Sequence, residues 1–285
     1  ALMNMTDVIR GDDHLSNTPK QIVVYNALGF KLPKFYHVPM INNPSGKKLS
    51  KRDGAMDVMD YKNLGYLPEA LLNFLVRLGW SNGDQEIFSM EEMLELFDPS
   101  NINKSSSSYN GEKLLWLNSE YIKAVSNDRL LEELKFFDLD LSHHSKKTEL
   151  LDLSKQRAQT LVELKKSITD ILEVPTSYEE SGVKKFVKED TKDFLEKYLE
   201  LLEKNKDELY NIENVEAITK PFIHDLGLKF PQLFQPIRIA LTGGTQAPSV
   251  YDIIAILGFN EVSARLKEAL KRNFQNTWLF NNNLA

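Results

Sequence analysis

From about residue 126 onward, apolar residues recur three and four positions apart, the spacing that places side chains on one face of an α-helix. The sets are Leu130, Leu131 and Leu134; Leu161, Leu164 and Ile168; and Phe194, Tyr198 and Leu202. No hairpin signal interrupts them. The second half of the chain is therefore predicted to be all helical.

Two better marked helices are predicted near the end of this half. Pro248 and Ser249 stand at the start of an apolar helical pattern that Gly258 ends. Asn260 is a suitable cap for the helix that follows. The sequence thus predicts a helical pair that is interrupted at the glycine.

The first 62 residues have a different pattern. Short strands are predicted at Met5–Ile9 and Phe35–Val38, with a turn at 10–13 and a helix from Thr18 to Leu28 between them. The helix is expected to open with a capping box led by Thr18. Strand, helix and strand in this order form a parallel crossover unit, and ligands bind such sheets at the carboxyl ends of the strands.

Residues 63–125 combine helices with loops. Pro68–Leu78 is an apolar helical stretch, and Ser89 with Glu92 forms a capping box for another helix. The short apolar stretch 113–117 fits either a strand or a helix, so both readings stay open. By composition alone this region is a packed connector.

Composition is that of an ordinary globular protein. The 285 residues are 42% hydrophobic and 27% charged. The absence of cysteine excludes disulfides and thiolate metal sites, and the five histidines show no zinc-ligand spacing. Because the sequence shows neither a membrane-length apolar run nor a leader pattern, we expect a cytoplasmic protein with no membrane contact.

Charge is distributed unevenly around a net value of −6. Residues 1–62 carry nine Lys/Arg against six Asp/Glu, whereas residues 63–125 carry four against nine. A second group of cations, at Lys146, Lys147, Lys155, Arg157, Lys165 and Lys166, outnumbers three acids between 146 and 166. These two regions are the candidates for contact with phosphate groups, although a charged helix face also serves solubility.

One loop between two glycines concentrates cations: Lys47, Lys48, Lys51 and Arg52. Lys48 and Lys51 are three residues apart, so that one turn of backbone can point both the same way, and Ser50 adds a neutral donor. Such a loop suits a polyphosphate ligand. The alternative is an ordinary solvated basic loop.

The residues of this loop resemble a known motif. Lys48–Arg52 is similar to the KMSKS loop of class I aminoacyl-tRNA synthetases, in the KLSKR form of the glutamyl-tRNA synthetases. Asp7–Gln21 resembles the stretch of that family that contains its glutamate-binding arginine, with Asp12 in place of the usual glutamate. Further matches lie at Gly65–Leu75, Leu78–Ser81 and Arg238–Gly243. The resemblance covers nearly the whole chain.

The resemblance implies a mostly α fold with a small α/β part. Residues 1–62 would form the second half of a Rossmann-type class I catalytic domain, and residues 63–125 a stem-contact α/β domain. Residues 126–174 and 175–285 would be the first and second parts of an all-helical anticodon-binding region. These boundaries are expectations for the domain organisation.

The resemblance also implies ATP-dependent glutamylation of tRNA by a monomer, with L-glutamate, ATP and tRNA as partners and Mg²⁺ entering with ATP. Arg10 would bind the substrate glutamate, and Lys48 and Lys51 would be catalytic, stabilising the leaving pyrophosphate. The ATP site would comprise Lys48, Leu49, Ser50, Lys51, Arg52 and Asp13. The tRNA and anticodon site would comprise Arg157, Arg238, Ala247, Pro248 and Tyr251. No metal site of the protein's own is expected.

Two of these assignments have plainer alternatives. Tyr251 is placed to stack on an anticodon base, since splayed bases are read by aromatic and guanidinium stacking, but it also fits a core position on a helix face. Arg10 also fits an ordinary charge at the end of a strand. Both alternatives stay open on the sequence.

One motif of class I synthetases is missing from this sequence. The first half of their catalytic domain carries a His-x-Gly-His motif that stabilises the adenylation transition state, and these 285 residues contain none. We therefore expect the chain to be the carboxyl-terminal portion of a longer enzyme and to be inactive alone.

Two rival functions compete with this interpretation. A glutaminyl-tRNA synthetase shares the catalytic half but reads its anticodon with β-barrels, which conflicts with the helical pattern here. Whether tRNA for glutamine is also charged depends on anticodon-facing positions that the sequence does not identify. A non-catalytic tRNA-binding module would explain the missing motif, but it has little use for Arg10 and the basic loop.

Overall fold

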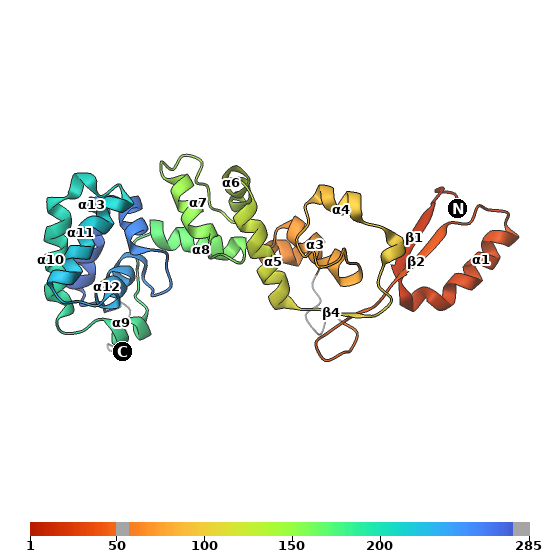
Figure 1. The fold of residues 1–285 in the computed structure, drawn as a ribbon, viewed down its shortest axis with the longest axis horizontal. Coiled ribbons are helices and arrows are strands. Elements are labelled where there is room, and N and C mark those ends of the chain that lie inside the picture. The colour runs from red at the N-terminus through yellow and green to blue at the C-terminus, as the bar shows by residue number, and fades with distance from the viewer. Residues whose placement is uncertain (50–56, 276–285) are drawn as a thin grey trace, which may run out of the picture. The chain divides into compact units, whose positions relative to one another are not determined.

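A computed structural model describes residues 1–49 and 57–275 (Figure 1). Ser50, Lys51 and Arg52, which belong to the predicted ATP site, lie outside the described residues. The chain divides into two compact units. Unit 1 comprises residues 1–125 and 159–161, and unit 2 comprises residues 126–158 and 162–285.

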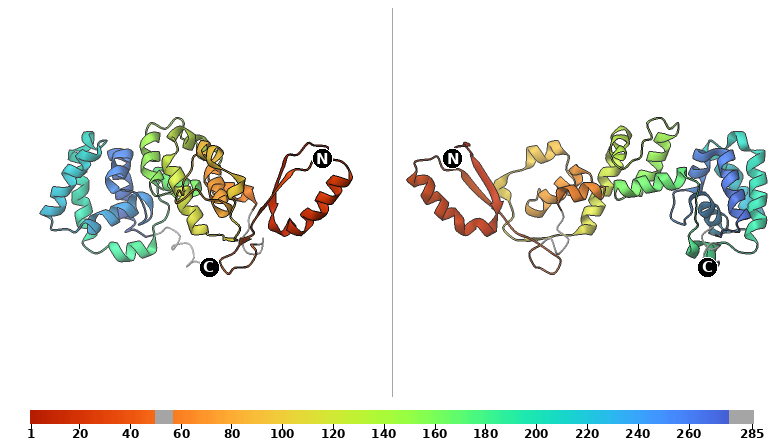
Figure 2. Two further views of the ribbon diagram at one scale, coloured as in Figure 1. Left: turned by 45° about the vertical axis from the view of Figure 1, so that its right-hand side comes forward. Right: turned by 180° about the vertical axis from the view of Figure 1, so that it is seen from behind.

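Unit 1 begins with the parallel crossover that the sequence predicts. Its elements are β1 (Asp7–Gly11), the 3-10 helix η1 (Asp12–Asn17), α1 (Thr18–Ala27) and β2 (Lys34–Val38). The two strands pair in parallel, with Arg10 opposite His37, and α1 runs beside them in each view (Figures 1 and 2). The first strand starts later than expected and includes Arg10, which therefore belongs to the sheet rather than to a turn.

The capping box predicted at Thr18 is wrong. The cap position is Asn17, and no side chain caps the amino end of α1. The hydroxyl of Thr18 instead lies 2.7 Å from Nη2 of Arg10 and 2.9 Å from Nε2 of His37. Because these partners come from the paired strands, the hydroxyl joins α1 to the sheet instead of ending a helix.

The rest of unit 1 is mainly helical. Its elements are β3 (Ile41–Asn42), α2 (Val58–Asn63), α3 (Pro68–Gly79), α4 (Met90–Leu96), η3 (Pro99–Asn101), β4 (Ser107–Ser108) and α5 (Gly111–Ala124). The capping box of α4 is confirmed, since Ser89 accepts from the backbone N–H of Glu92 at 3.1 Å and Glu92 accepts from that of Ser89. The stretch 113–117, open between strand and helix, is part of α5.

Two fully buried asparagines connect the helices of unit 1. Oδ1 of Asn118, on α5, accepts from the backbone N–H of Leu67 at 2.8 Å, and Nδ2 donates to the carbonyl of Gln159 at 2.6 Å. Asn73, on α3, accepts from the N–H of Phe88 at 2.8 Å and donates to the carbonyl of Glu86 at 2.9 Å. Both amides thus satisfy backbone groups of loops that cross the core.

Unit 2 is helical throughout its described residues, as the sequence predicts. Its elements are α6 (Asn127–Lys135), α7 (Lys147–Lys155), α8 (Leu161–Leu172), α9 (Glu180–Phe186), α10 (Thr191–Lys204), η4 (Lys206–Glu208), α11 (Ile212–Asp225), α12 (Phe230–Thr242) and α13 (Val250–Lys271). Across the described parts of both units, no helix is long and apolar enough to cross a bilayer.

The last helix is broken at the predicted glycine. Gly258 has φ 72° and ψ 172°, a left-handed conformation outside the helical range, and it interrupts α13. The predicted cap at Asn260 is wrong, because Gly258 is the residue with non-helical angles and Asn260 already lies within the second segment. A Cβ at Gly258 would come within 2.7 Å of Cε1 of Tyr210. This close ring contact also excludes a larger residue.

A buried arginine joins three helices of unit 2. Arg265, on α13, is 2% exposed. Its Nη1 donates to the carbonyls of Ile171 at 2.9 Å and Leu241 at 2.6 Å, and its Nη2 donates to that of Leu172 at 2.9 Å. Nε completes the set with Glu261 at 2.8 Å. The acceptors lie at the carboxyl ends of α8 and α12, where unpaired carbonyls and the helix dipole favour a cation.

Candidate functional site

Arg10 is held at the carboxyl end of β1 with part of its guanidinium unused. Its Nη2 donates to Thr18 at 2.7 Å, and its Cζ lies 5.3 Å from the centre of the Phe35 ring. Within the described residues, Nε is buried and has no hydrogen-bond partner. A half-buried guanidinium with a free donor and a fixed plane is suited to a carboxylate ligand.

Asp13 and Lys48 meet beside the end of this strand. Oδ2 of Asp13 lies 3.7 Å from Nζ of Lys48, and the two side chains are 49% and 65% exposed. A Cβ on Gly11 would come within 2.5 Å of Oδ1 of Asp13, so the glycine gives the carboxylate its space. Because the ion pair is long and exposed, it holds Lys48 only weakly, and a phosphate ligand can compete for it.

Lys48 lies on a short hairpin that continues from β3. Asn42 and Lys48 form an antiparallel bridge, and the N–H of Leu49 donates to the carbonyl of Ile41 at 2.9 Å. Asn43 closes the turn, since its Oδ1 accepts from the N–H of Lys47 at 2.9 Å. The hairpin therefore fixes the backbone of the first two KLSKR residues and leaves the lysine side chain exposed.

Arg157 and Arg238 both bind the connection between α12 and α13. Nη1 of Arg157 donates to the carbonyl of Ala247 at 3.1 Å, and Nη2 of Arg238 donates to that of Pro248 at 3.3 Å. The side chains of Ala247 and Pro248 are buried. Burial lowers the pKa of Arg238, and the neighbouring charge of Arg157 lowers it further. The structure thus brings four of the five predicted tRNA residues together.

Tyr251, the fifth predicted tRNA residue, lies in the first turn of α13. Its ring meets that of Phe234 edge to face, with centres 5.0 Å apart. Its hydroxyl is buried and has no hydrogen-bond partner within the described residues. Burial, with a contribution from Glu216, raises the pKa of Tyr251. The ring contact fits the core alternative, and stacking on a base stays a prediction.

The cation cluster at 146–166 is less basic than its sequence suggests. Lys146, Lys155 and Lys166 pair with Glu149, Asp152 and Asp170 at 3.2, 3.1 and 2.5 Å. Each acid is three or four residues from its lysine on a helix or at its end, a spacing typical of surface pairs. The attraction to an RNA backbone is correspondingly weaker than the count of cations implies.

A groove of unit 2 runs beside the Ala247–Pro248 backbone. Its polar lining comprises Ser154, Arg157, Glu163, Lys166, Ser167, Asp170 and Gln246. Cations and acids balance there, while hydroxyl, amide and guanidinium groups offer donors and acceptors. This mixture matches the edge of a nucleobase better than it matches a phosphate.

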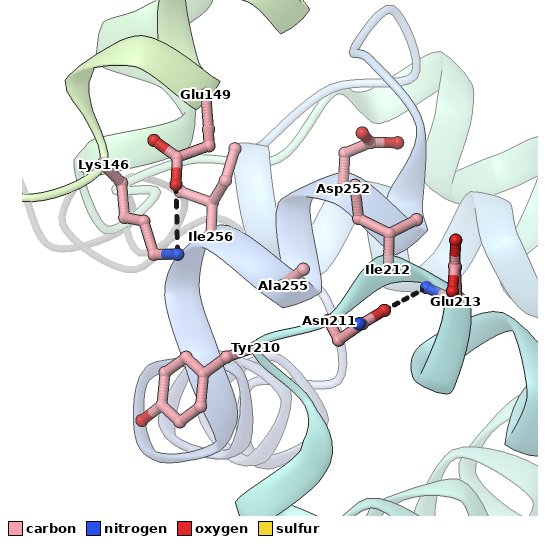
Figure 3. Close-up of a pocket in the computed structure, with 9 residues that line it drawn as sticks. All are labelled: Lys146, Glu149, Tyr210, Asn211, Ile212, Glu213, Asp252, Ala255 and Ile256. Carbon is pink, nitrogen blue, oxygen red and sulfur yellow. Dashed lines mark hydrogen bonds and ion pairs between the residues drawn. The ribbon is translucent and has the colours of Figure 1, made fainter.

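A second pocket, drawn in Figure 3, has the opposite character. Glu149, Glu213 and Asp252 contribute carboxylates, against the single ammonium of Lys146, which itself pairs with Glu149. The excess of negative charge disfavours a phosphate backbone. No group of three His, Cys, Asp or Glu side chains within the described residues could hold a metal ion.

Two models of known protein families match this chain. Residues 112–270 match the anticodon binding domain model, and residues 1–116 match that of the tRNA synthetases class I (E and Q), catalytic domain. The chain belongs to the anticodon binding domain family. The fold class expected from the sequence is thereby confirmed.

Relatives of this family member are glutamate–tRNA ligases. Glutamate–tRNA ligase 1 of Aliarcobacter butzleri is 85% identical over 97% of the chain and 59% of the relative, and that of Campylobacter hominis is 54% identical over 95% and 58%. A crystal structure of a glutamate tRNA ligase from Elizabethkingia meningosepticum has TM-score 0.81 and 28% identity, covering 94% of this chain and 57% of that one. The chain therefore spans less than two thirds of its relatives. The family resemblance stated from the sequence is confirmed.

Sequence reasoning missed several polar residues that fix the backbone within the two units. Asn118 and Asn73 stand in apolar helical patterns, where an amide is the signal of a buried polar contact. Arg265 lies four residues after Glu261 and is indistinguishable in sequence from a surface ion pair. Glu179, which binds Thr245, is 66 residues away from it and gives no local signal.

Proposed function

We propose that this chain is the part of a glutamate–tRNA ligase that binds glutamate, contacts the phosphates of ATP and reads tRNA. The observation that carries the proposal is the half-buried guanidinium of Arg10 at the carboxyl end of β1, whose Nε has no hydrogen-bond partner within the described residues, near the ion pair of Asp13 and Lys48. The glutamate–tRNA ligase relatives support the choice of amino acid and of tRNA.

In this proposal Arg10 binds the glutamate substrate through paired hydrogen bonds. A carboxylate oxygen of glutamate attacks the α-phosphorus of ATP, and pyrophosphate leaves. A ribose hydroxyl of the terminal adenosine of tRNA then attacks the acyl carbon of the resulting glutamyl-adenylate, forming an ester and releasing AMP. Mg²⁺ enters with ATP. Lys48 and Lys51 stabilise the charge that develops on pyrophosphate, while Leu49, Ser50 and Arg52 complete the loop and Asp13 orients the substrates.

Arg157, Arg238, Ala247, Pro248 and Tyr251 serve the anticodon in the same proposal. The two arginines donate to the adjacent carbonyls of Ala247 and Pro248, beside a groove of balanced charge. An unpaired base can enter such a groove and bind by stacking and edge hydrogen bonds. We further propose that the enzyme acts as a monomer in the cytoplasm.

The catalytic half of the proposal is tested by ATP–pyrophosphate exchange with glutamate. The 285-residue chain alone should show none, because its sequence lacks the His-x-Gly-His motif. In a full-length ligase that contains this chain, Lys51→Ala should lower the exchange rate on the order of 10²-fold with little change in glutamate affinity. An unchanged rate would remove the loop from the mechanism.

The RNA half is tested by binding of the chain to tRNA. Arg238→Ala should cost roughly 1–3 kcal/mol for a glutamate tRNA and little for a tRNA with an unrelated anticodon. Lys147→Ala is the matched control, because a phosphate contact should weaken both tRNAs equally and flatten the salt dependence. Equal losses for Arg238→Ala on the two tRNAs would contradict the anticodon assignment.

The same measurements separate the rivals. A binding module would bind tRNA but show no exchange in any full-length form. A glutaminyl-tRNA synthetase would exchange with glutamine, and the helices of the described part of unit 2 do not provide the β-barrels of that family.

A further inference from the structure

The connection between α12 and α13 begins with a turn at Gly243 that residues 177 and 179 contact. Gly243 has φ 82°, and a Cβ there would come within 2.9 Å of the carbonyl oxygen of Ser177. Its own carbonyl accepts from the backbone N–H of Glu179 at 2.7 Å. The segment just before α9 thus touches the turn through its main chain.

The carboxylate of Glu179 binds the next part of the turn. Oε2 accepts from the backbone N–H of Thr245 at 2.8 Å and from its hydroxyl at 2.7 Å. Oε1 accepts from the hydroxyl of Ser181 at 2.7 Å. These donors, Ser181 first, hold the pKa of Glu179 below its ordinary value, so it is an ionised acceptor at neutral pH.

Packing reinforces this contact. A Cβ on Gly182 would come within 2.5 Å of Cγ2 of Thr245, which shows how closely α9 approaches the turn. Ala247 and Pro248, whose carbonyls accept from Arg157 and Arg238, lie two and three residues beyond Thr245. A carboxylate that fixes Thr245 therefore also sets where both arginines find their acceptors.

We propose that Glu179 is a positioning residue for tRNA recognition. It holds the turn at Thr245 so that Arg157 and Arg238 keep the orientation in which they meet the anticodon. This inference rests on the proposed function of the two arginines and adds a residue from a separate part of the chain. Glu179 itself does not touch RNA; it removes conformational freedom that binding would otherwise have to remove.

The test compares Glu179→Ala with Glu180→Ala. Glu180 is the matched control, because it is the next residue, its side chain is 77% exposed, and its carboxylate pairs with the exposed Lys184 at 2.8 Å. Removing either acid changes the charge near RNA equally. Glu179→Ala should raise the Kd for a glutamate tRNA about 10-fold but leave an unrelated tRNA at the level of the control. Glu179→Gln, whose amide oxygen still accepts, should recover most of the loss.

A double-mutant cycle with Thr245→Val ties the effect to this contact. Once Glu179 is alanine, Thr245→Val should add little, because the hydroxyl that it removes has already lost its acceptor. Three results would overturn the proposal: cognate binding unchanged by Glu179→Ala, equal losses for both tRNAs, or additive losses in the cycle. If the unsubstituted chain failed to discriminate between the tRNAs, the proposed function would fail first, and that outcome is seen before any substitution is made.

Discussion

Unit 1 and unit 2 both bury polar side chains at their centres, but unit 1 uses amides and unit 2 uses a guanidinium. Asn73 satisfies one backbone N–H and one carbonyl, and Asn118 satisfies one N–H and the carbonyls of Gln159 and Gly65, at loops where both kinds of group are left over. Arg265 faces three carbonyls at helix carboxyl ends, where only acceptors are left over. The backbone groups that lack partners thus determine which side chain can occupy the centre.

The cations of the candidate sites differ from Arg265 in how far they are exposed and in how many of their donors bind the protein. The guanidinium of Arg265 donates its hydrogen bonds to groups of the protein, and its side chain is 1% exposed. Lys48 is 65% exposed, and its ion pair with Asp13 is long at 3.7 Å, so its charge is available to a ligand. Arg157 and Arg238 are intermediate, since each donates to one carbonyl. A count of cations in a sequence does not distinguish buried, partly bonded and exposed cations.

The largest effect on stability is expected from Arg265→Met. The substitution leaves three buried carbonyls without donors and should lower the free energy of unfolding of unit 2 by about 3–5 kcal/mol. Hydrogen exchange resolved by segment, measured with increasing urea, would separate unit 2 from unit 1. Lys184→Met, which removes an exposed ion pair, is the control and should change stability by less than about 0.5 kcal/mol. A small effect of Arg265→Met would mean that water replaces the guanidinium.

Asn118→Asp tests whether the buried position of Asn118 in unit 1 requires an uncharged side chain. An aspartate keeps the acceptor for Leu67 but, when ionised, cannot donate to the carbonyl of Gln159, so unit 1 should lose roughly 2–3 kcal/mol at pH 8. Burial raises the pKa of such a carboxyl in the folded state, so the loss should shrink as the pH falls towards 5. In a chain that carries Trp278→Phe, tryptophan fluorescence follows unit 1 through Trp80 and Trp116. The exposed Asn82→Asp is the control, and a pH-independent loss would contradict this account.

A smaller effect concerns Tyr121, whose hydroxyl lies 2.8 Å from Oδ1 of Asn73 and 2.5 Å from the carbonyl of Phe88. Burial raises its pKa from 10.0 to about 12. Because the folded pKa is the higher one, the stabilisation is complete below pH 10 and is lost as the pH rises towards 12. Tyrosinate absorbance should show one titration step near pH 12 that Tyr121→Phe abolishes, together with a loss of about 1 kcal/mol. A step that persists in the variant would place the shift elsewhere.

The smallest effect on stability is expected at Lys48. Removing an exposed cation, Lys48→Ala should leave the free energy of unfolding within about 0.5 kcal/mol of the original. In a full-length ligase the same change should lower ATP–pyrophosphate exchange on the order of 10²-fold. Asp13→Asn is the companion variant, because it removes the partner of Lys48 and keeps the lysine. A stability loss as large as that of Arg265→Met would remove the distinction between the two cations.

Periodicity and caps predicted most of the fold. The helices of unit 2, the parallel crossover of unit 1 and the break at Gly258 follow from local rules that each segment obeys by itself. The wrong predictions, at Thr18 and Asn260, come from residues with good local chemistry and a different tertiary role. The Thr18 hydroxyl bonds to Arg10 and His37, which lie on two strands that no local rule brings to it.

The candidate sites were predictable only where a motif named them. Arg10 and Lys48 stand in motifs, and the structure pairs Lys48 with Asp13, in the 3-10 helix that follows β1. The sequence does not predict hydrogen-bond partners that lie far apart along the chain. Arg157 lies 90 residues from its acceptor Ala247. Such pairs exist only after folding, so spacing carries no trace of them.

The placement of Arg265 also constrains the order in which the chain can mature. A ribosome finishes α8 long before it makes α13, because the arginine lies 94 residues after its acceptor Ile171. Until then, the carbonyls at the end of α8 must stay hydrated. A nascent chain halted before Arg265 should therefore hold unit 2 as loosely associated helices that a protease can cut, while unit 1 is already protected.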